Sequence, residues 1–263
     1  MFTTTFQMTD PPFEERAPVE RLLPDERVTQ ALARLRYFAE DGAVALLTGD
    51  TGVGKSSTVK LFLESLPKNR YQPLYLHLTR LRPMAFLKLL VTALGEIPLR
   101  GKERLFLQIL EKTKSAETTT LLVVDEAHLL DPDTLVDLRL LVSSALEKTP
   151  PLKILLVGQK PLRDQLRQAR HADLLHRICV TAHLDPLSKE QTSAYIDFRI
   201  RTVGGPERLF PPEVKSAIHD YTRGIPRLIN NLATACLINA AARRLQQINE
   251  ALLNDTLGEI HLV

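Results

Sequence analysis

Two spacings of hydrophobic residues alternate along this 263-residue chain. Short apolar runs predict buried strands, and longer stretches with apolar positions three or four apart predict amphipathic helices. The predicted strands cover about 44–48, 74–78, 121–124, 153–157 and 178–183. The predicted helices cover about 25–40, 55–66, 83–94 and 103–114, a long stretch after Asp131-Pro132 and a short one after Pro161.

The alternation of strands and helices indicates a doubly wound α/β fold with a five-stranded parallel sheet. After Pro186 no strand pattern follows, and helices are predicted at about 188–203, 212–222, 226–244 and 249–259. A capping box at Ser188 and Gln191 opens the first of these helices. We therefore expect an α/β core over 25–185 and a small all-helical lid domain over 186–263.

Residues 1–24 contain four prolines and predict an extended N-terminal arm. Phe2, Phe6 and Phe13 would be its aromatic anchors. The arm could pack across the core of its own chain or dock on a neighbouring subunit.

One glycine-rich stretch follows the first predicted strand and opens a helix. It is Gly49-Asp50-Thr51-Gly52-Val53-Gly54-Lys55-Ser56, followed by Ser57. It matches G-x-x-x-x-G-K-[ST], in which backbone N–H groups cradle phosphates at a helix N-terminus. We expect these nine residues to bind nucleotide, with Lys55 on the β- and γ-phosphates and the Ser56 hydroxyl on Mg²⁺. A plain strand-to-helix turn, the alternative, needs neither the Lys–Ser pair nor three glycines.

Polar residues end two of the later strands. Asp125 and Glu126 follow the apolar run at 121–124, and Gln159 follows the fourth strand. Ligands of open α/β sheets bind at the carboxyl ends of the strands. We expect Asp125 to hold the Mg²⁺ shell and Glu126 to orient the attacking water, because phosphoryl transfer requires mainly positioning and charge neutralisation. We expect the fourth strand to lie between the first and third, so that Gln159 can reach the γ-phosphate or the water.

Composition adds few constraints. The net charge of +3 is compatible with a nucleic-acid partner without requiring one. The two cysteines, Cys179 and Cys236, have no metal-binding or disulfide-framework spacing. No apolar run approaches the roughly 18 residues of a membrane span, and the N-terminus lacks the pattern of a signal peptide. We expect a soluble, cytoplasmic protein with no membrane partner.

The order of these features resembles the AAA+ ATPases, which have a P-loop core followed by a helical lid. More closely, GVGKSS, LLVVDEAHLL, ILLVGQKPLR, LDPLSKEQTSAYIDFRI and GIPRLINNLA resemble the ExeA/GspA-like ATPases. The resemblance covers about residues 5–260. That family also includes stand-alone ATP-binding proteins encoded beside DDE transposases, similar in role to the TniB/TnsC and IstB regulators. The resemblance implies ATP and Mg²⁺ as cofactors.

The resemblance implies two further site residues. Arg227, in Gly224-Ile225-Pro226-Arg227, is similar to the sensor-2 arginine that reaches the γ-phosphate within its own subunit. Arg177, just before the fifth strand, matches the place of the family's arginine finger, and Arg170 competes for that role. A finger would complete a neighbour's site, so the active form would be a homo-oligomer, either a ring or a helical filament.

The resemblance also implies a basic DNA-binding surface. Its candidate residues lie around the third predicted helix and in the loop that follows: Arg80, Arg82, Lys88, Arg100 and Lys102. Such residues would neutralise phosphates of double-stranded DNA in a salt-sensitive, sequence-independent manner. Alternatively, they are ordinary solvated surface charges.

Three functions compete. The first is an oligomerising, DNA-binding ATPase that regulates transposition by selecting target DNA and recruiting a DDE-type transposase. The second is a secretion ATPase of the ExeA/GspA type that acts on envelope components. The fuller secretion proteins carry a membrane segment and a peptidoglycan-binding module, and this chain shows neither, so we expect the first. The third is a nucleotide-gated interaction module with little turnover, which the presence of Glu126 disfavours.

Overall fold

The computed structural model describes residues 2–14, 17–77, 80–143 and 151–259. The chain forms two compact units. The α/β unit comprises Glu26–Thr51 and Lys55–Leu184, and the helical unit comprises Met1–Asp25, Gly52–Gly54 and Asp185–Val263. Each unit has its own hydrophobic core.

The α/β unit contains the predicted five-stranded parallel sheet. Its strands are β1 (Val44–Gly49), β2 (Tyr71–His77), β3 (Thr119–Asp125), β4 (Leu152–Gly158) and β5 (Ile178–Leu184). They are ordered β2-β3-β4-β1-β5, and all neighbouring pairs are parallel. The central strands β1, β3 and β4 are buried almost throughout, as their unbroken apolar runs predict. The edge strands β2 and β5 instead alternate between buried and exposed residues.

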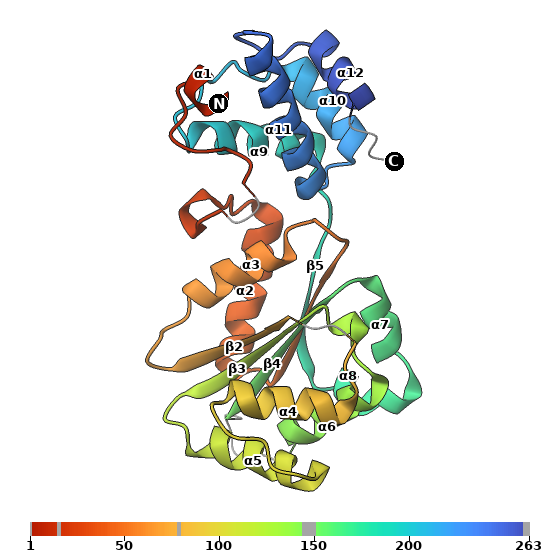
Figure 1. The fold of residues 1–263 in the computed structure, drawn as a ribbon. Coiled ribbons are helices and arrows are strands. Elements are labelled where there is room, and N and C mark those ends of the chain that lie inside the picture. The colour runs from red at the N-terminus through yellow and green to blue at the C-terminus, as the bar shows by residue number, and fades with distance from the viewer. Residues whose placement is uncertain (1, 15–16, 78–79, 144–150, 260–263) are drawn as a thin grey trace. The chain divides into compact units, whose positions relative to one another are not determined.

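Helices cover both faces of this sheet (Figure 1). They are α2 (Glu26–Asp41), α3 (Lys55–Glu64), α4 (Pro83–Ala93), α5 (Lys102–Ser115), α6 (Pro132–Ser143), α7 (Lys160–Leu166) and α8 (Ala172–Leu175). Figure 1 shows α2 and α3 on one side of the sheet and α4, α5 and α6 on the other. The four-residue helix α8 was not predicted from the sequence, and neither were three short 3₁₀ turns at Val19–Arg21, Ala127–Leu129 and Ala169–His171.

Strand β2 begins three residues earlier than predicted, at Tyr71 instead of residue 74. The sequence obscures this start, because exposed Gln72 and Pro73 interrupt the apolar run. Proline is tolerated in an edge strand, where a missing N–H need not break the hydrogen-bond ladder. The buried Tyr71 hydroxyl donates to the Ala39 carbonyl of α2 at 2.8 Å and fixes the start of the strand.

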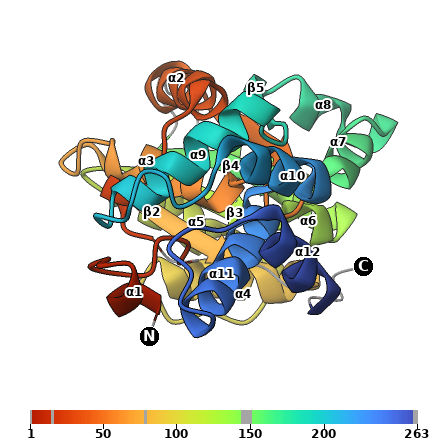
Figure 2. The ribbon, with the colours of Figure 1, turned by 90° about the horizontal axis from the view of Figure 1, so that it is seen from above.

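The helical unit contains α9 (Lys189–Arg201), α10 (Pro212–Thr222), α11 (Pro226–Ala242) and α12 (Glu250–Glu259). The predicted capping box is confirmed: the Ser188 hydroxyl accepts from the Gln191 N–H, and the Gln191 side chain accepts from the Ser188 N–H. Apolar faces of all four helices form the core of this unit. Figure 2 shows α1 (Phe2–Thr5) beside α11, and the two helices are in contact.

The N-terminal segment packs on the helical unit of its own chain and is not simply extended, because it begins with the short helix α1. Its Phe6, Met8 and Phe13 are buried in the core of that unit. Phe13 meets Phe210 edge-on, with ring centroids 6.1 Å apart. These apolar side chains are therefore used within the chain, and the segment shares one compact unit with the four helices.

Buried Arg199 of α9 anchors this segment. Its Nε donates to the Pro12 carbonyl at 2.6 Å, and its Nη2 donates to the Glu14 carbonyl at 3.0 Å. Its Nη1 donates to the Tyr195 hydroxyl at 3.0 Å. The guanidinium thus satisfies backbone acceptors that lie nearly two hundred residues away in the sequence.

We expect Arg199→Ala to lower the free energy of unfolding of the helical unit by roughly 2–4 kcal/mol, because it leaves these acceptors without their charged donor. Thermal and urea unfolding would measure the loss. Arg201→Ala, which removes an exposed cation from the same helix, is the matched control and should change stability by less than about 0.5 kcal/mol. Equal effects of the two substitutions would contradict the anchoring role.

Candidate active site

The glycine-rich loop connects the end of β1 to the start of α3. Gly52 and Gly54 have positive φ angles of 82° and 108°, which side-chain-bearing residues rarely adopt. A Cβ atom at Gly54 would meet no atom within 4 Å, so its backbone borders open space. The loop therefore has the curled backbone and the room that an anion cradle at the N-terminus of α3 requires.

Lys55 stabilises this loop. Its Nζ donates to the Gly49 and Asp50 carbonyls, each at 2.9 Å, and the residue is only 5% exposed. Burying an ammonium group requires such acceptors. The same group carries a positive charge at the start of α3, where phosphate oxygens would bind.

Asp125 ends β3 beside the first turn of α3. Its Oδ1 accepts the Glu126 N–H at 2.9 Å, and its Oδ2 lies 3.4 Å from the Ser56 hydroxyl. Asp125 is 2% exposed. A carboxylate and a hydroxyl fit Mg²⁺, which is typically held by one or two carboxylates and completed by phosphate oxygens and water. Among the described residues, no group of three or more His, Cys, Asp or Glu side chains forms a dedicated metal cage.

Two side chains of β2 that the sequence analysis missed also reach Asp125. The Tyr75 hydroxyl donates to Asp125 Oδ2, and His77 Nδ1 lies 3.6 Å from the same oxygen. Burial raises the pKa of Tyr75, and its hydrogen bond to Asp125 raises it further. The sequence did contain one indication of these two residues: Tyr75 and His77 alternate with an apolar residue at the end of β2, the strand that pairs with β3.

Glu126 follows in a left-handed conformation, with a φ of 56°. Such backbone conformations are uncommon for residues with a side chain and cluster at functional sites. Gln159 Nε2 lies 3.5 Å from Glu126 Oε2, and His128 Nδ1 lies 3.3 Å from the same oxygen. As predicted, β4 lies between β3 and β1, and this order brings Gln159 to Glu126. His128 is a further neighbour that the sequence analysis missed.

The two candidate arginine fingers differ in their surroundings. Arg170 forms an ion pair with Asp133. Arg177 is exposed between α8 and β5 and has no ion pair or side-chain hydrogen bond within the described part of the chain. Arg227 lies in the first turn of α11, in the helical unit, and its role at a nucleotide stays a prediction.

The five predicted DNA-binding cations all belong to the α/β unit. Arg80 and Arg82 precede α4, Lys88 lies within α4, and Arg100 precedes α5; all four are at least partly exposed. Lys102 differs, because its Nζ pairs with Oδ1 of buried Asp137 at 2.7 Å. Its charge therefore compensates a carboxylate within the fold.

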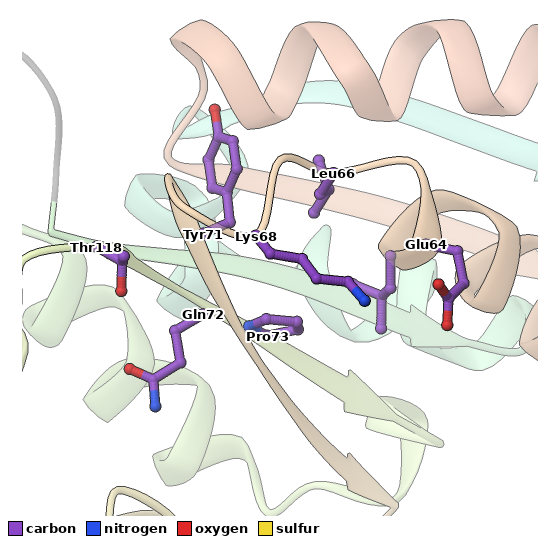
Figure 3. Close-up of a pocket in the computed structure, with 8 residues that line it drawn as sticks. Glu64, Leu66, Lys68, Tyr71, Gln72, Pro73 and Thr118 are labelled. Atoms are coloured by element: carbon purple, nitrogen blue, oxygen red, sulfur yellow. The ribbon is translucent and has the colours of Figure 1, made fainter.

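A separate hollow of about 610 Å³ lies at the amino-terminal end of the sheet (Figure 3). Its lining comes from the end of α3, the following turn, the start of β2 and the residue before β3: Leu63, Glu64, Leu66, Lys68, Tyr71, Gln72, Pro73 and Thr118. It lies away from the carboxyl ends of β1, β3 and β4, where the residues of the candidate site meet.

The fold and the site define an AAA+ ATPase, with a P-loop after β1 and an Asp–Glu pair after β3. Residues 39–166 match the AAA domain family. The chain is 33% identical over 252 residues to the General secretion pathway protein A of Aeromonas hydrophila. The match covers 92% of this chain but only 45% of that protein, so the chain spans less than half of its relative. The comparisons thus support an AAA+ ATPase that is similar, over most of its length, to part of General secretion pathway protein A.

Solved structures with the same fold have low sequence identity to this chain. The Aeropyrum pernix ORC2 protein has a TM-score of 0.74 and 15% identity, and the match covers 97% of this chain and 72% of that one. The Aeropyrum pernix ORC1 protein in complex with DNA has a TM-score of 0.70 and 16% identity, with 96% and 70% covered. No helix among the described residues is long and apolar enough to cross a membrane.

We expect Gly54→Ala to weaken nucleotide binding and to lower stability by about 1–3 kcal/mol through backbone strain alone, since no neighbouring atom obstructs the added methyl group. The control is Gly258→Ala in helix α12, where an added methyl group also meets no neighbouring atom but the φ angle is not positive. This substitution should leave stability unchanged or raise it by up to about 1 kcal/mol. Equilibrium binding of a fluorescent ATP analogue and thermal unfolding would measure both effects. Unchanged binding by Gly54→Ala would contradict the anion cradle.

Proposed function

We propose that this ATPase binds Mg²⁺·ATP at the P-loop, assembles with further copies of itself on double-stranded DNA, and regulates DNA transposition. In this function it selects target DNA and recruits a DDE-type transposase. The observation that carries the proposal is the convergence of Asp125, Glu126 and Gln159, at the ends of β3 and β4, with Ser56 in the first turn of α3 after the glycine-rich loop.

Each residue has a role that matches its place. The loop N–H groups and Lys55 bind phosphate oxygens, and Ser56 with Asp125 holds the cation. Bound Mg²⁺ would neutralise charge on the phosphate oxygens. Glu126, whose carboxylate lies 3.5 Å from the Gln159 amide, orients the attacking water, and Gln159 fixes that carboxylate.

Arg177 would make the ATPase site a site shared between two subunits, because it would act on nucleotide bound by a neighbouring copy. Because Arg170 is paired with Asp133 while Arg177 is exposed, Arg177 is the better candidate for a finger that reaches a neighbouring copy. Arg227 acts on the γ-phosphate from the helical unit of its own subunit. ATP would then stabilise contacts between subunits, and hydrolysis would release them.

DNA binding is supported by the four cations at the surface around α4 and by the relative that was solved with DNA. Lys102 is the weakest of the five candidates, since it is paired with Asp137. The transposition role rests on the resemblance of the sequence motifs to the ExeA/GspA-like ATPases, a family that also includes ATP-binding proteins encoded beside DDE transposases.

A second candidate function is secretion. The similarity to General secretion pathway protein A, at 33% identity over most of this chain, favours it. In that case the same ATPase site would drive remodelling of envelope components, and duplex DNA would not stimulate assembly or hydrolysis. The DNA dependence of ATPase activity therefore separates the two functions.

Glu126→Gln should lower the rate of ATP hydrolysis by about a hundredfold or more while nucleotide binding is retained, because the amide cannot accept a proton from the water. The variant should accumulate in the assembled state, which sedimentation in the presence of ATP would measure. Glu111→Gln, an exposed change on α5, is the matched control. Normal turnover by Glu126→Gln would remove Glu126 from this role.

Arg177→Ala should retain nucleotide binding but lose the hydrolysis that depends on assembly, by about 10³-fold if it acts as a finger. Arg170→Ala is the control, and we expect it to hydrolyse ATP at the wild-type rate. The measurement is ATPase activity as a function of protein concentration. The opposite pattern, in which only Arg170→Ala loses activity, would assign the finger to Arg170.

The double substitution Arg80→Glu with Arg82→Glu should weaken duplex binding without changing ATP affinity. The slope of log affinity against log salt should fall in magnitude by about two, because each arginine would neutralise one phosphate. Arg36→Glu with Lys68→Glu makes the same change in net charge at exposed positions elsewhere on the α/β unit, and it should have a much smaller effect. Identical salt dependence in the two double variants would exclude the loop before α4.

A further inference from the structure

Tyr75 is placed by the register of the sheet. In the pairing of β2 with β3, His77 lies opposite Asp125 and Tyr75 lies opposite Val123. Residues two apart on a strand share a face, so Tyr75 and His77 both lie on the face of Asp125. A long aromatic side chain can reach the diagonal neighbour on the next strand. The Tyr75 hydroxyl does so and donates to Asp125 Oδ2.

The two oxygens of Asp125 are held differently. Oδ1 accepts a backbone hydrogen bond from the Glu126 N–H, which the chain itself fixes. Oδ2 is the oxygen that faces Ser56, at 3.4 Å from its hydroxyl. The terminal torsion of an aspartate is broad, so one hydrogen bond on Oδ1 leaves the direction of Oδ2 weakly defined. The Tyr75 hydroxyl supplies the second constraint.

His77 is a poor substitute for this constraint. Its Nδ1 lies 3.6 Å from Asp125 Oδ2, and its side chain is 65% exposed. Tyr75, in contrast, donates a hydrogen bond directly to that oxygen. Tyr75 is also partly exposed on an edge strand, so removing its hydroxyl leaves the strand otherwise intact.

We propose that Tyr75 is a positioning residue of the metal site: its hydroxyl holds Asp125 Oδ2 toward Ser56, in the orientation that binds a divalent cation together with nucleotide. This inference rests on the proposed role of Ser56 and Asp125 in holding Mg²⁺. Residues that orient metal ligands contribute to metal affinity without touching the metal, and their loss typically costs 10–100-fold.

The test is Tyr75→Phe, which removes only the hydroxyl. Binding of a fluorescent, non-hydrolysable ATP analogue would be titrated with Mg²⁺, and the analogue's affinity in EDTA would be measured separately. We expect the Mg²⁺ midpoint to rise about tenfold while the affinity in EDTA stays unchanged. Tyr37→Phe, an exposed tyrosine on α2, is the matched control and should leave the midpoint unchanged. Thermal unfolding would verify that both variants are folded.

A double-mutant cycle with Asp125→Ala shows whether Tyr75 acts through Asp125. We expect Tyr75→Phe to have no further effect on the Mg²⁺ midpoint once the carboxylate is removed. An unchanged or lower Mg²⁺ midpoint in Tyr75→Phe would overturn the positioning role of Tyr75, and so would a full tenfold shift in the Asp125→Ala background. Either result would leave the proposed metal site of Ser56 and Asp125 standing. If Asp125→Ala itself leaves the midpoint unchanged, the proposed metal assignment fails, and this inference fails with it.

Discussion

The order of the strands is the constraint on which the site depends. Because β4 lies between β1 and β3, the carboxyl ends of three buried parallel strands meet at one edge of the sheet. Each strand end supplies a different chemical group: β1 leads into the loop that ends in Lys55, β3 leads to the carboxylates of Asp125 and Glu126, and β4 is followed by the amide of Gln159. A strand order that did not place β4 between β1 and β3 would separate groups that lie 3.4–3.5 Å apart here. The apolar runs therefore specify the position of the chemistry as well as the core.

Much of this arrangement could be predicted from the sequence. Unbroken apolar runs mark central parallel strands, and the glycine-rich loop connects β1 to α3 as its spacing predicts. Tyr75, His77 and His128 could not be found in this way, because their roles depend on cross-strand register and on side-chain reach. The N-terminal segment packs on its own chain, which was one of the two alternatives that its sequence left open. The short helix at its start and the anchoring of the segment by Arg199 and three apolar side chains depend on tertiary contacts and were not predicted.

Charged residues show the same limit. The family resemblance offered Arg170 and Arg177 as competing fingers, and it placed Lys102 among the DNA-binding cations. The structure pairs Arg170 with Asp133 at the surface and Lys102 with buried Asp137, so each of these charges has a partner within the α/β unit. A linear pattern identifies where cations cluster, but the partner of each cation is decided by tertiary contacts.

The proposed function requires that ATP bound at this site join copies of the chain on duplex DNA. Electron microscopy of the protein with a non-hydrolysable ATP analogue, with and without duplex DNA, tests it most directly. The account predicts rings or filaments that form with the analogue, are extended or ordered by DNA, and are absent from Lys55→Ala. Monomers under all of these conditions, or assemblies that Lys55→Ala forms equally well, would contradict it.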